Sequence, residues 1–403
     1  MSVWCHGDFM KSIRVLTLAV LLALTGSRAL AAVGCDQPCR GLLLEAQVLE
    51  SKAKYQEALA KYKAAEALDP SASVPVSLAA GLLLKLSTAV PQDKRAQLRD
   101  MARAMAERAA TLAADDPVAQ EVLRMLDDDG PSPLRAPNAA AARLMAEGEA
   151  AFQREDFAAA LPKYEATMRA DPAYSSAVVA AGNTYYVRRD WARAEALFRQ
   201  ATEIEPHNSQ AWRFLSDALL YQDKRTAAEA ALYKAIEADP SQRPNWDKLA
   251  RYRAGAGLPL KTLGLRRGVR VVPDADGKLG LSLDPKHDSE QTPDHAFRLA
   301  LGISEVKLRN DDKAAGKARS AFEIELAAWQ LALKIADEAE ANSGEGIGNP
   351  ALLQIRALAR DGQLEPAILL LMFRQAYRPA LAAWTAANPG AVKNFIDRYG
   401  VKP

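Results

Sequence analysis

Three pairs of an acidic residue and proline recur at a constant interval in the middle of this chain of 403 residues. They are Asp171-Pro172, Glu205-Pro206 and Asp239-Pro240, and each follows the previous one by 34 residues. Proline lacks a backbone N–H and clashes with the preceding helical turn, so each pair is expected to end a helix. A period of this length predicts a helix-turn-helix hairpin that stacks on copies of itself. Residues 141–242 are therefore expected to form a row of helical hairpins.

Small residues recur in register with these pairs. They are found at Gly148, Gly182 and Ser216, and again at Ala160, Ala194 and Ala228. The two helices of a hairpin are expected to cross closely at these positions, where a larger side chain would push them apart. Large residues such as Tyr185 and Phe198 are expected to fill the space between successive hairpins.

The middle unit, residues 175–208, resembles the tetratricopeptide repeat (TPR), whose pattern is Trp-x2-Leu-Gly-x2-Tyr, then Ala-x3-Phe, then Pro. Its matching positions are Gly182, Tyr185, Ala194, Phe198, Ala201 and Pro206. The preceding unit matches at Leu144, Gly148, Phe157, Ala160, Tyr164 and Pro172, and the following one at Trp212, Leu215, Ala228, Leu232, Ala235 and Pro240. The resemblance implies an all-α, right-handed TPR superhelix of stacked hairpins.

The pattern extends beyond these three units. Residues 39–72 resemble a further copy, and residues 75–116 a degenerate one whose second helix is expected to end at Asp116-Pro117. Downstream, Trp246 begins a capping helix. The expected domains are a signal peptide at 1–31, N-terminal TPR-like helices at 35–126, a linker at 127–138, the main TPR array with its capping helix at 139–258, a β-hairpin connection at 259–290 and an α-helical C-terminal domain of unknown role at 291–403.

No family resemblance covers the last two domains, so their structure is predicted from residue patterns alone. Two short apolar runs, 269–272 and 279–283, flank a polar loop and predict a short β-hairpin. Asp274, Asp276 and Gly277 in that loop evoke a calcium site, but Leu279 and Pro285 stand where ligands are needed, so a turn is favoured. The C-terminal domain is expected to hold helices at 294–309, 314–341, 350–360, 364–387 and 390–399.

The N-terminus has the layout of a secretory signal peptide. Basic residues precede an uncharged run at 15–24, and Ala29-Leu30-Ala31 offers a cleavage site. The run is about half the length that spans a bilayer, so export to the periplasm or beyond is expected, with Met1 or Met10 as the initiator. Cys35 and Cys39 follow the cut and are expected to form a local disulfide. An alternative is a lipoprotein anchored to the membrane at Cys35, because residues 33–35 resemble a lipobox.

Charge and motifs narrow the class of function. Removal of the signal peptide leaves a formally neutral chain without a basic run, which argues against nucleic-acid binding. Nucleophile, phosphate-loop and dinucleotide motifs are absent from the sequence, so neither an enzyme nor a cofactor is expected. The one metal-capable cluster lacks the spacing of a metal site and is better explained as a polar helix entrance; it consists of His287, Asp288, Glu290, Asp294 and His295.

The TPR resemblance implies that a ligand contacts the first helix of each hairpin, which lines the concave face. The expected groove residues are Glu149, Phe152, Gln153, Asn183, Tyr186, Arg213, Asp217 and Tyr221. Tyrosine and arginine often carry binding energy at interfaces, although the tyrosines could equally cover the hairpin seam. Asn183 also matches the carboxylate clamp of some family members, but Val179 replaces its lysine, so that activity is not carried over.

The sequence therefore predicts a non-enzymatic scaffold or adaptor of the cell envelope that binds a peptide or protein segment in the TPR groove. The alternative is an enzyme, such as a metal-dependent hydrolase, whose C-terminal domain acts on substrates that the repeats recruit.

Overall fold

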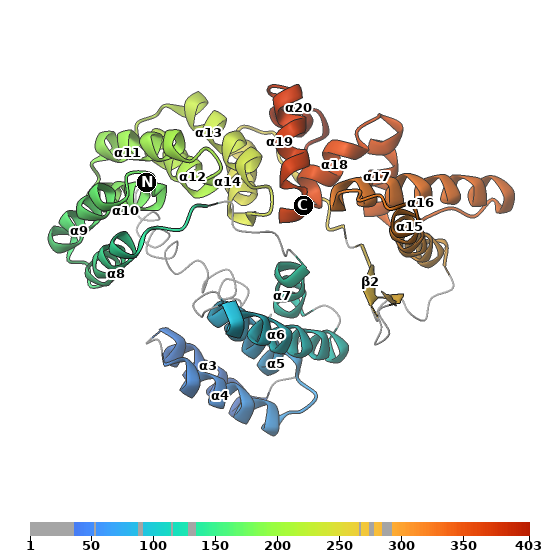
Figure 1. The fold of residues 1–403 in the computed structure, drawn as a ribbon, viewed down its shortest axis with the longest axis horizontal. Helices are drawn as coiled ribbons and strands as arrows, with labels where there is room; N and C mark the ends of the chain where they lie inside the picture. The colour runs from blue at the N-terminus through green and yellow to red at the C-terminus, as the bar shows by residue number, and fades with distance from the viewer. Residues whose placement is uncertain are drawn as a thin grey trace. The chain divides into compact units, whose positions relative to one another are not determined.

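The computed structural model of the chain describes residues 36–51, 54–87, 92–113, 116–127, 134–265, 267–273, 278–283 and 292–403. The chain divides into two compact units, one of residues 1–129 with 283–290 and one of residues 130–282 with 291–403. Helices dominate both units (Figure 1). None of the described helices combines the length and the apolar character needed to cross a membrane.

The first unit consists of helical hairpins with a further helix. Its helices are α3 (Gln37–Ser51), α4 (Tyr55–Leu68), α5 (Ser73–Ser87), α6 (Gln92–Leu112) and α7 (Pro117–Asp127). Cys39, Tyr62 and Leu82 lie in its core. The Asp116 carboxylate accepts the backbone N–H groups of Val118 and Ala119 at 2.9 and 3.0 Å. The prediction that Asp116-Pro117 ends a helix was wrong, because this acid caps the start of α7.

The second unit begins with a row of helices that follow one another from α8 to α14 (Figure 1). They are α8 (Ala139–Gln153), α9 (Phe157–Ala170), α10 (Ser175–Val187), α11 (Trp191–Ile204), α12 (Ser209–Leu220), α13 (Arg225–Ala238) and α14 (Arg243–Gly255). The unit continues with β1 (Lys261–Thr262), β2 (Val269–Pro273), β3 (Leu279–Leu283), α15 (Pro293–Ala315), α16 (Ala321–Ser343), α17 (Pro350–Arg360), α18 (Leu364–Leu371), η3 (Gln375–Tyr377), α19 (Arg378–Ala387), α20 (Ala391–Tyr399) and β4 (Val401–Lys402).

The helices of a hairpin cross closely at the small residues that recur in the sequence. A Cβ atom added to Gly148 would lie 2.7 Å from the Tyr164 ring, and one added to Gly182 would lie 2.7 Å from the Phe198 ring. Ala160 and Ala194, in the facing helices, are completely buried. This confirms the predicted stacking of hairpins and its reason, because these contacts leave no room for a larger side chain.

One strained turn joins the two helices of each hairpin. Glu155, Arg189 and Asp223 adopt φ angles of 61°, 63° and 58°, in the left-handed region, and Gly257 at 76° continues the 34-residue series. In each turn this residue donates its N–H to the carbonyl three residues earlier, and the next residue donates to the carbonyl five residues earlier. This is the Schellman arrangement, which usually places glycine at the left-handed position.

The acidic residue of each acid–proline pair connects one hairpin to another part of the unit. Asp171 accepts hydrogen bonds from the Arg135 guanidinium at 2.6 Å and from the Asn138 backbone N–H at 2.9 Å. Glu205 accepts one from the Arg135 backbone N–H at 2.7 Å. Asp239, in the last full hairpin, lies 3.7 Å from the Arg378 guanidinium. The recurring acids therefore fasten the array at both ends.

The array ends where the fourth hairpin would continue. The turn at Gly257 is complete, but Pro259 stands where the second helix would begin, and the chain instead enters β1. β1 pairs in parallel with β4, so Lys261 lies opposite Val401. Arg253 of α14 donates to the Tyr233 hydroxyl at 2.5 Å and also pairs with Asp397 of α20. The C-terminal helix is thus bound to the last helices of the array.

The C-terminal helices correct two predicted boundaries. The helix predicted at 314–341 starts at Ala321, because Gly316 ends α15 in the left-handed conformation and Ser320 forms a capping box with Glu323. The single helix predicted at 364–387 was wrong, because it is divided between α18 and α19. Pro379, at the start of α19, would clash with the carbonyl of the preceding turn in a continuous helix.

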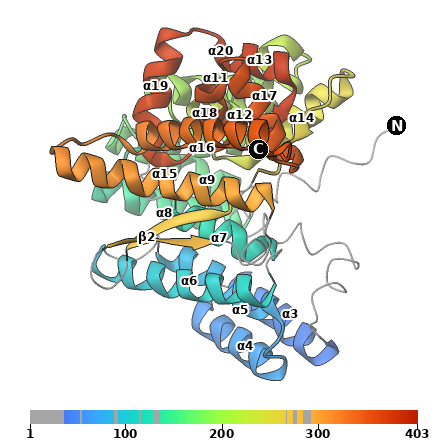
Figure 2. The ribbon, with the colours of Figure 1, turned by 90° about the vertical axis from the view of Figure 1, so that its right-hand side faces the viewer.

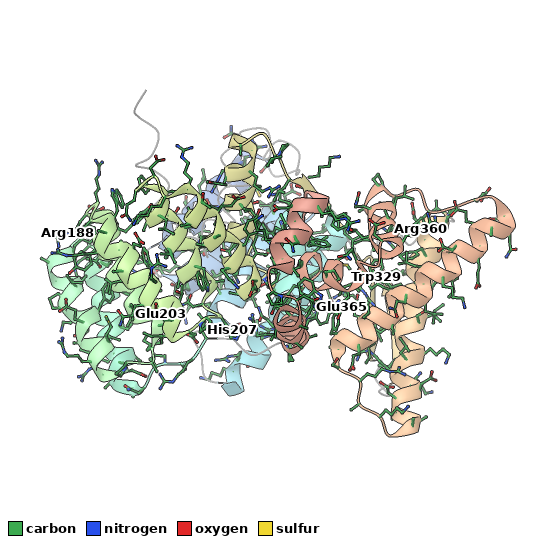
Figure 3. All side chains as sticks on the ribbon, turned by 90° about the horizontal axis from the view of Figure 1, so that it is seen from above. Arg188, Glu203, His207, Trp329, Arg360 and Glu365 are labelled. Carbon is green, nitrogen blue, oxygen red and sulfur yellow. The ribbon has the colours of Figure 1, made fainter. Side chains whose placement is uncertain are left out.

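The predicted β-hairpin of β2 and β3 is confirmed and packs against α15 (Figure 2). Side chains of Val269 and Leu281 occupy the space above Gly302. Arg267, just before β2, pairs with two buried carboxylates, Glu305 of α15 and Glu325 of α16. Trp329, labelled in Figure 3, is completely buried and donates its indole N–H to Glu325 at 2.8 Å.

We predict that Gly182→Ala destabilises the second unit. The added methyl group meets the Phe198 ring, and overpacking of this kind lowers the free energy of unfolding by about 1–3 kcal/mol. Thermal or denaturant unfolding measures the change. Gly255→Ala is the control, because a Cβ atom at that helical position meets nothing within 4 Å. Equal stability of the two variants would contradict the close crossing.

We further predict that Arg189→Gly stabilises the protein. The left-handed conformation costs a non-glycine residue about 1–2 kcal/mol, of which the greater freedom of glycine in the unfolded chain cancels part, leaving a gain of about 0.5–1 kcal/mol. Denaturant unfolding is the measurement. Arg188→Gly, one residue earlier at φ −83°, should bring no gain, and a gain of the same size there would refute the role of the turn.

Candidate protein-binding face

The first helices of the hairpins, α8, α10, α12 and α14, share one face of the array, which we call the first-helix face. Two contacts between α12 and α14 define it. The Arg213 guanidinium lies 3.4 Å from the Asn245 side-chain oxygen, and the Lys248 ammonium pairs with the Asp217 carboxylate. Polar side chains from successive repeats therefore meet directly, without a second helix between them.

The residues predicted on α8 differ in their surroundings. Glu149 is half-buried and accepts a hydrogen bond from the Tyr164 hydroxyl at 2.9 Å. Burial raises the pKa of Glu149, while this hydrogen bond acts in the opposite direction. Phe152 is buried against Phe157, with ring centroids 5.2 Å apart, and Gln153 is exposed. Of this group, Glu149 and Gln153 present polar atoms on or near the surface.

Asn183 of α10 is the least satisfied of the predicted residues. Its side chain is 7 % exposed, and its Oδ1 atom has no hydrogen-bond partner among the described residues. A buried amide oxygen without a donor costs about 1–3 kcal/mol. The first-helix face therefore keeps an unmet acceptor at a position where the sequence predicted a ligand contact.

Two largely buried basic side chains, Arg213 and Lys248, lie on the neighbouring part of this face. Burial lowers the pKa of Arg213, and the Asp217 carboxylate opposes that effect. Burial also lowers the pKa of Lys248, where Arg213 and Arg251 add to the effect and Asp217 again opposes it. Arg213 and Arg251 thus both disfavour the charge on Lys248, and an added negative charge would be attracted to these basic side chains.

Two predicted contact residues lie deeper than expected. Tyr186 and Arg213 are each 8 % exposed. Tyr186 packs edge-on against Trp191 and Tyr221, with ring centroids 4.9 and 5.7 Å away. This placement agrees with the alternative that tyrosines cover the hairpin seam. Tyr221 differs, because it is 47 % exposed and stacks on Trp191 at 4.3 Å and 9°.

Three residues of the face escaped the sequence analysis. Asn245 and Lys248 lie on α14, which the sequence suggested as a packing cap, so its polar positions were not considered. Trp191 begins a second helix, but the turn before it brings its ring back to Tyr186 and Tyr221. The aromatic residue two positions after the first two turns was a usable signal, since Phe157 contacts Phe152 as Trp191 contacts Tyr186.

The remaining sequence predictions concern cysteines and metals. Cys39 is completely buried in α3, and Cys35 lies outside the described residues, so their disulfide stays a prediction. His287 and Glu290 also lie outside the described residues. The Asp294 carboxylate, near His295, accepts the backbone N–H groups of Gly348 and Asn349, each at 3.1 Å. No group of three His, Cys, Asp or Glu side chains that could hold a metal occurs in the described parts of the chain.

Comparison with known proteins identifies the repeats. Residues 145–200 and 179–243 match the family model described as tetratricopeptide repeat. No curated protein matches the chain.

Three of the solved structures that match parts of this chain are the following. The first TPR of Spaghetti, bound to an HSP90 peptide, is 18 % identical, with 30 % of this chain and 99 % of that chain covered and a TM-score of 0.29. YrrB, a TPR protein with an unusual peptide-binding site, is 19 % identical, with 51 % and 89 % covered and a TM-score of 0.24. MamA from Desulfovibrio magneticus RS-1 is 16 % identical, with 52 % and 99 % covered and a TM-score of 0.24.

Because these TM-scores are low, the family assignment rests on the sequence match together with the stacked hairpins. Residues 145–243 are therefore tetratricopeptide repeats.

Proposed function

We propose that this protein is a non-enzymatic scaffold that binds a segment of another protein on the first-helix face of its repeats. The observation that carries the proposal is the buried Asn183 oxygen, which has no partner among the described residues. A backbone N–H of an extended segment would satisfy that oxygen. Stacked repeats of this kind form extended concave surfaces that bind ligands.

Electrostatics supports the same face. Burial lowers the pKa of Arg213 and of Lys248, Arg213 and Arg251 add to the effect on Lys248, and Asp217 opposes it at both groups. A carboxylate of a bound segment would relieve this repulsion and accept hydrogen bonds from the guanidinium. The segment we propose therefore combines a free backbone N–H with an acidic group. Neither a cofactor nor a nucleic acid is needed for this role.

We also propose that the protein acts in the cell envelope after export, with a disulfide between Cys35 and Cys39. The support is the signal-peptide pattern of residues 1–31 and the pair of cysteines that follows it. Its partner would then be an envelope protein.

Replacement of Asn183 tests the binding role apart from folding. We expect Asn183→Ala to leave thermal stability unchanged or raised, because it removes an unsatisfied buried oxygen and favours the helix by about 0.5 kcal/mol. Binding to an envelope protein captured by the wild type should weaken by about tenfold, the effect of one lost hydrogen bond. Calorimetry and a binding titration measure the two quantities.

Asn245→Ala is the matched control. The Asn245 amide donates to the Ala235 carbonyl at 3.1 Å and accepts from Arg213, so its loss should lower the free energy of unfolding by about 1–3 kcal/mol. If Asn183→Ala instead lowers stability as Asn245→Ala does and leaves binding intact, Asn183 is a packing residue and the proposed face is wrong.

The location is tested by the N-terminus of the protein recovered from cells. We expect mass spectrometry to find a mature chain that begins shortly after Ala31, with Cys35 and Cys39 resistant to alkylation until they are reduced. A chain that retains residues 15–24 would refute export by cleavage. A mature chain that begins at an acylated Cys35 would instead establish the lipoprotein alternative.

A further inference from the structure

An exposed aromatic ring stands out on the repeat array. Among residues 139–238, all of which the structure describes, Tyr221 is the one large apolar side chain that is exposed. Single exposed apolar residues are common on protein surfaces and need no explanation by themselves. Tyr221 differs because its ring is held in place by an aromatic cluster rather than extended freely into solvent.

The cluster joins two repeats. Trp191, which begins the second helix of one repeat, stacks parallel to Tyr221, which follows the first helix of the next. Tyr186 contacts both rings from beneath and is itself buried. The Gln222 amide donates to the Trp191 carbonyl at 3.3 Å and to the Glu195 carboxylate at 2.8 Å. A ring fixed in this way loses little conformational freedom when a ligand covers it.

Basic residues lie next to Trp191 in the sequence. The turn before Trp191 holds Arg188 and Arg189, and Arg193 follows one helical turn later. Asp190 pairs with Arg193 at 3.2 Å, and the segment 188–193 carries a formal net charge of +2. Arg188 is exposed at the edge of the array (Figure 3). The charge complement of this surface is an acidic ligand.

We infer that the stacked pair of Trp191 and Tyr221 is an anchor for a ring side chain, aromatic or proline, within an acidic peptide. The inference rests on the proposed function, because Tyr221 ends the first helix that also carries Arg213 and Asp217. A ring laid on Tyr221 extends the stack that Trp191 begins, and aromatic surfaces of this kind also receive prolines of extended peptides. Acidic residues beside the ring meet Arg188 and its neighbours.

The test uses a phage-displayed library of random peptides, selected on the purified full-length protein. Enriched sequences should combine a Phe, Tyr, Trp or Pro with acidic neighbours. A selected peptide is then titrated against the wild type and against Tyr221→Ala, with the peptide's ring residue intact or replaced by Ala. Each single replacement should weaken binding by about tenfold or more. Both together should weaken it little further, because they remove the same contact.

Controls separate binding from folding. Tyr221→Phe keeps the stack and should bind as the wild type does, and circular dichroism checks that Tyr221→Ala remains folded. Leu258→Ala, at another exposed apolar side chain of the same unit, should leave binding unchanged. Arg188→Glu should reduce the enrichment of acidic residues.

The outcomes distinguish this inference from the proposed function. Enriched peptides that lack a ring, or whose binding is indifferent to Tyr221→Ala, would overturn the anchor while leaving a peptide-binding face in place. The same holds if the losses from the two replacements simply add. A selection that enriches no peptide at all would count against both.

Discussion

The repeat array depends on the close crossing of two helices at one small residue in each hairpin. Where Gly182 faces Phe198, the ring occupies the volume that any side chain would need. This contact sets the distance between the helices, and that distance decides how the next hairpin can stack. In the following repeat Ser216 takes the glycine's place, and its hydroxyl is buried without a hydrogen-bond partner among the described residues. The crossing is thus maintained there at the cost of an unsatisfied polar atom.

The stacking of hairpins brings first helices together, and this creates the proposed binding face. Side chains far apart in the sequence become neighbours, as Asp217 and Lys248 do although 31 positions separate them. The last repeat also needs a cap, because a repeat without a neighbour exposes its apolar side. Here the C-terminal segment, more than a hundred residues further along the chain, packs against that repeat. Asp397 binds Arg253 and Tyr233, and β4 pairs with β1. The C-terminal helices therefore hold the last repeat in place.

Much of this fold could be predicted from the sequence, because its repeating contacts leave a repeating pattern. The period of the acid–proline pairs predicted the hairpins, and the small residues predicted where the helices cross. The depth of individual groove residues could not be predicted. The position of Tyr186 and Arg213 in the repeat predicts which helix carries each of them. Their burial depends on side chains from other elements, namely Trp191, Tyr221 and Asn245. The left-handed turns between helices could not be predicted either, because non-glycine residues occupy positions where a glycine would have indicated the end of a helix.

Hydrogen exchange of the purified protein, with and without a peptide selected for binding to it, tests the central claim most directly. The claim is that the first helices of the repeats form the ligand-binding face. Bound peptide should slow exchange in α10, α12 and α14, and in α11 at its first turn alone, and should leave α9, α13 and the rest of α11 unchanged. Protection confined to the second helices, or to the C-terminal helices α15–α20, would contradict it.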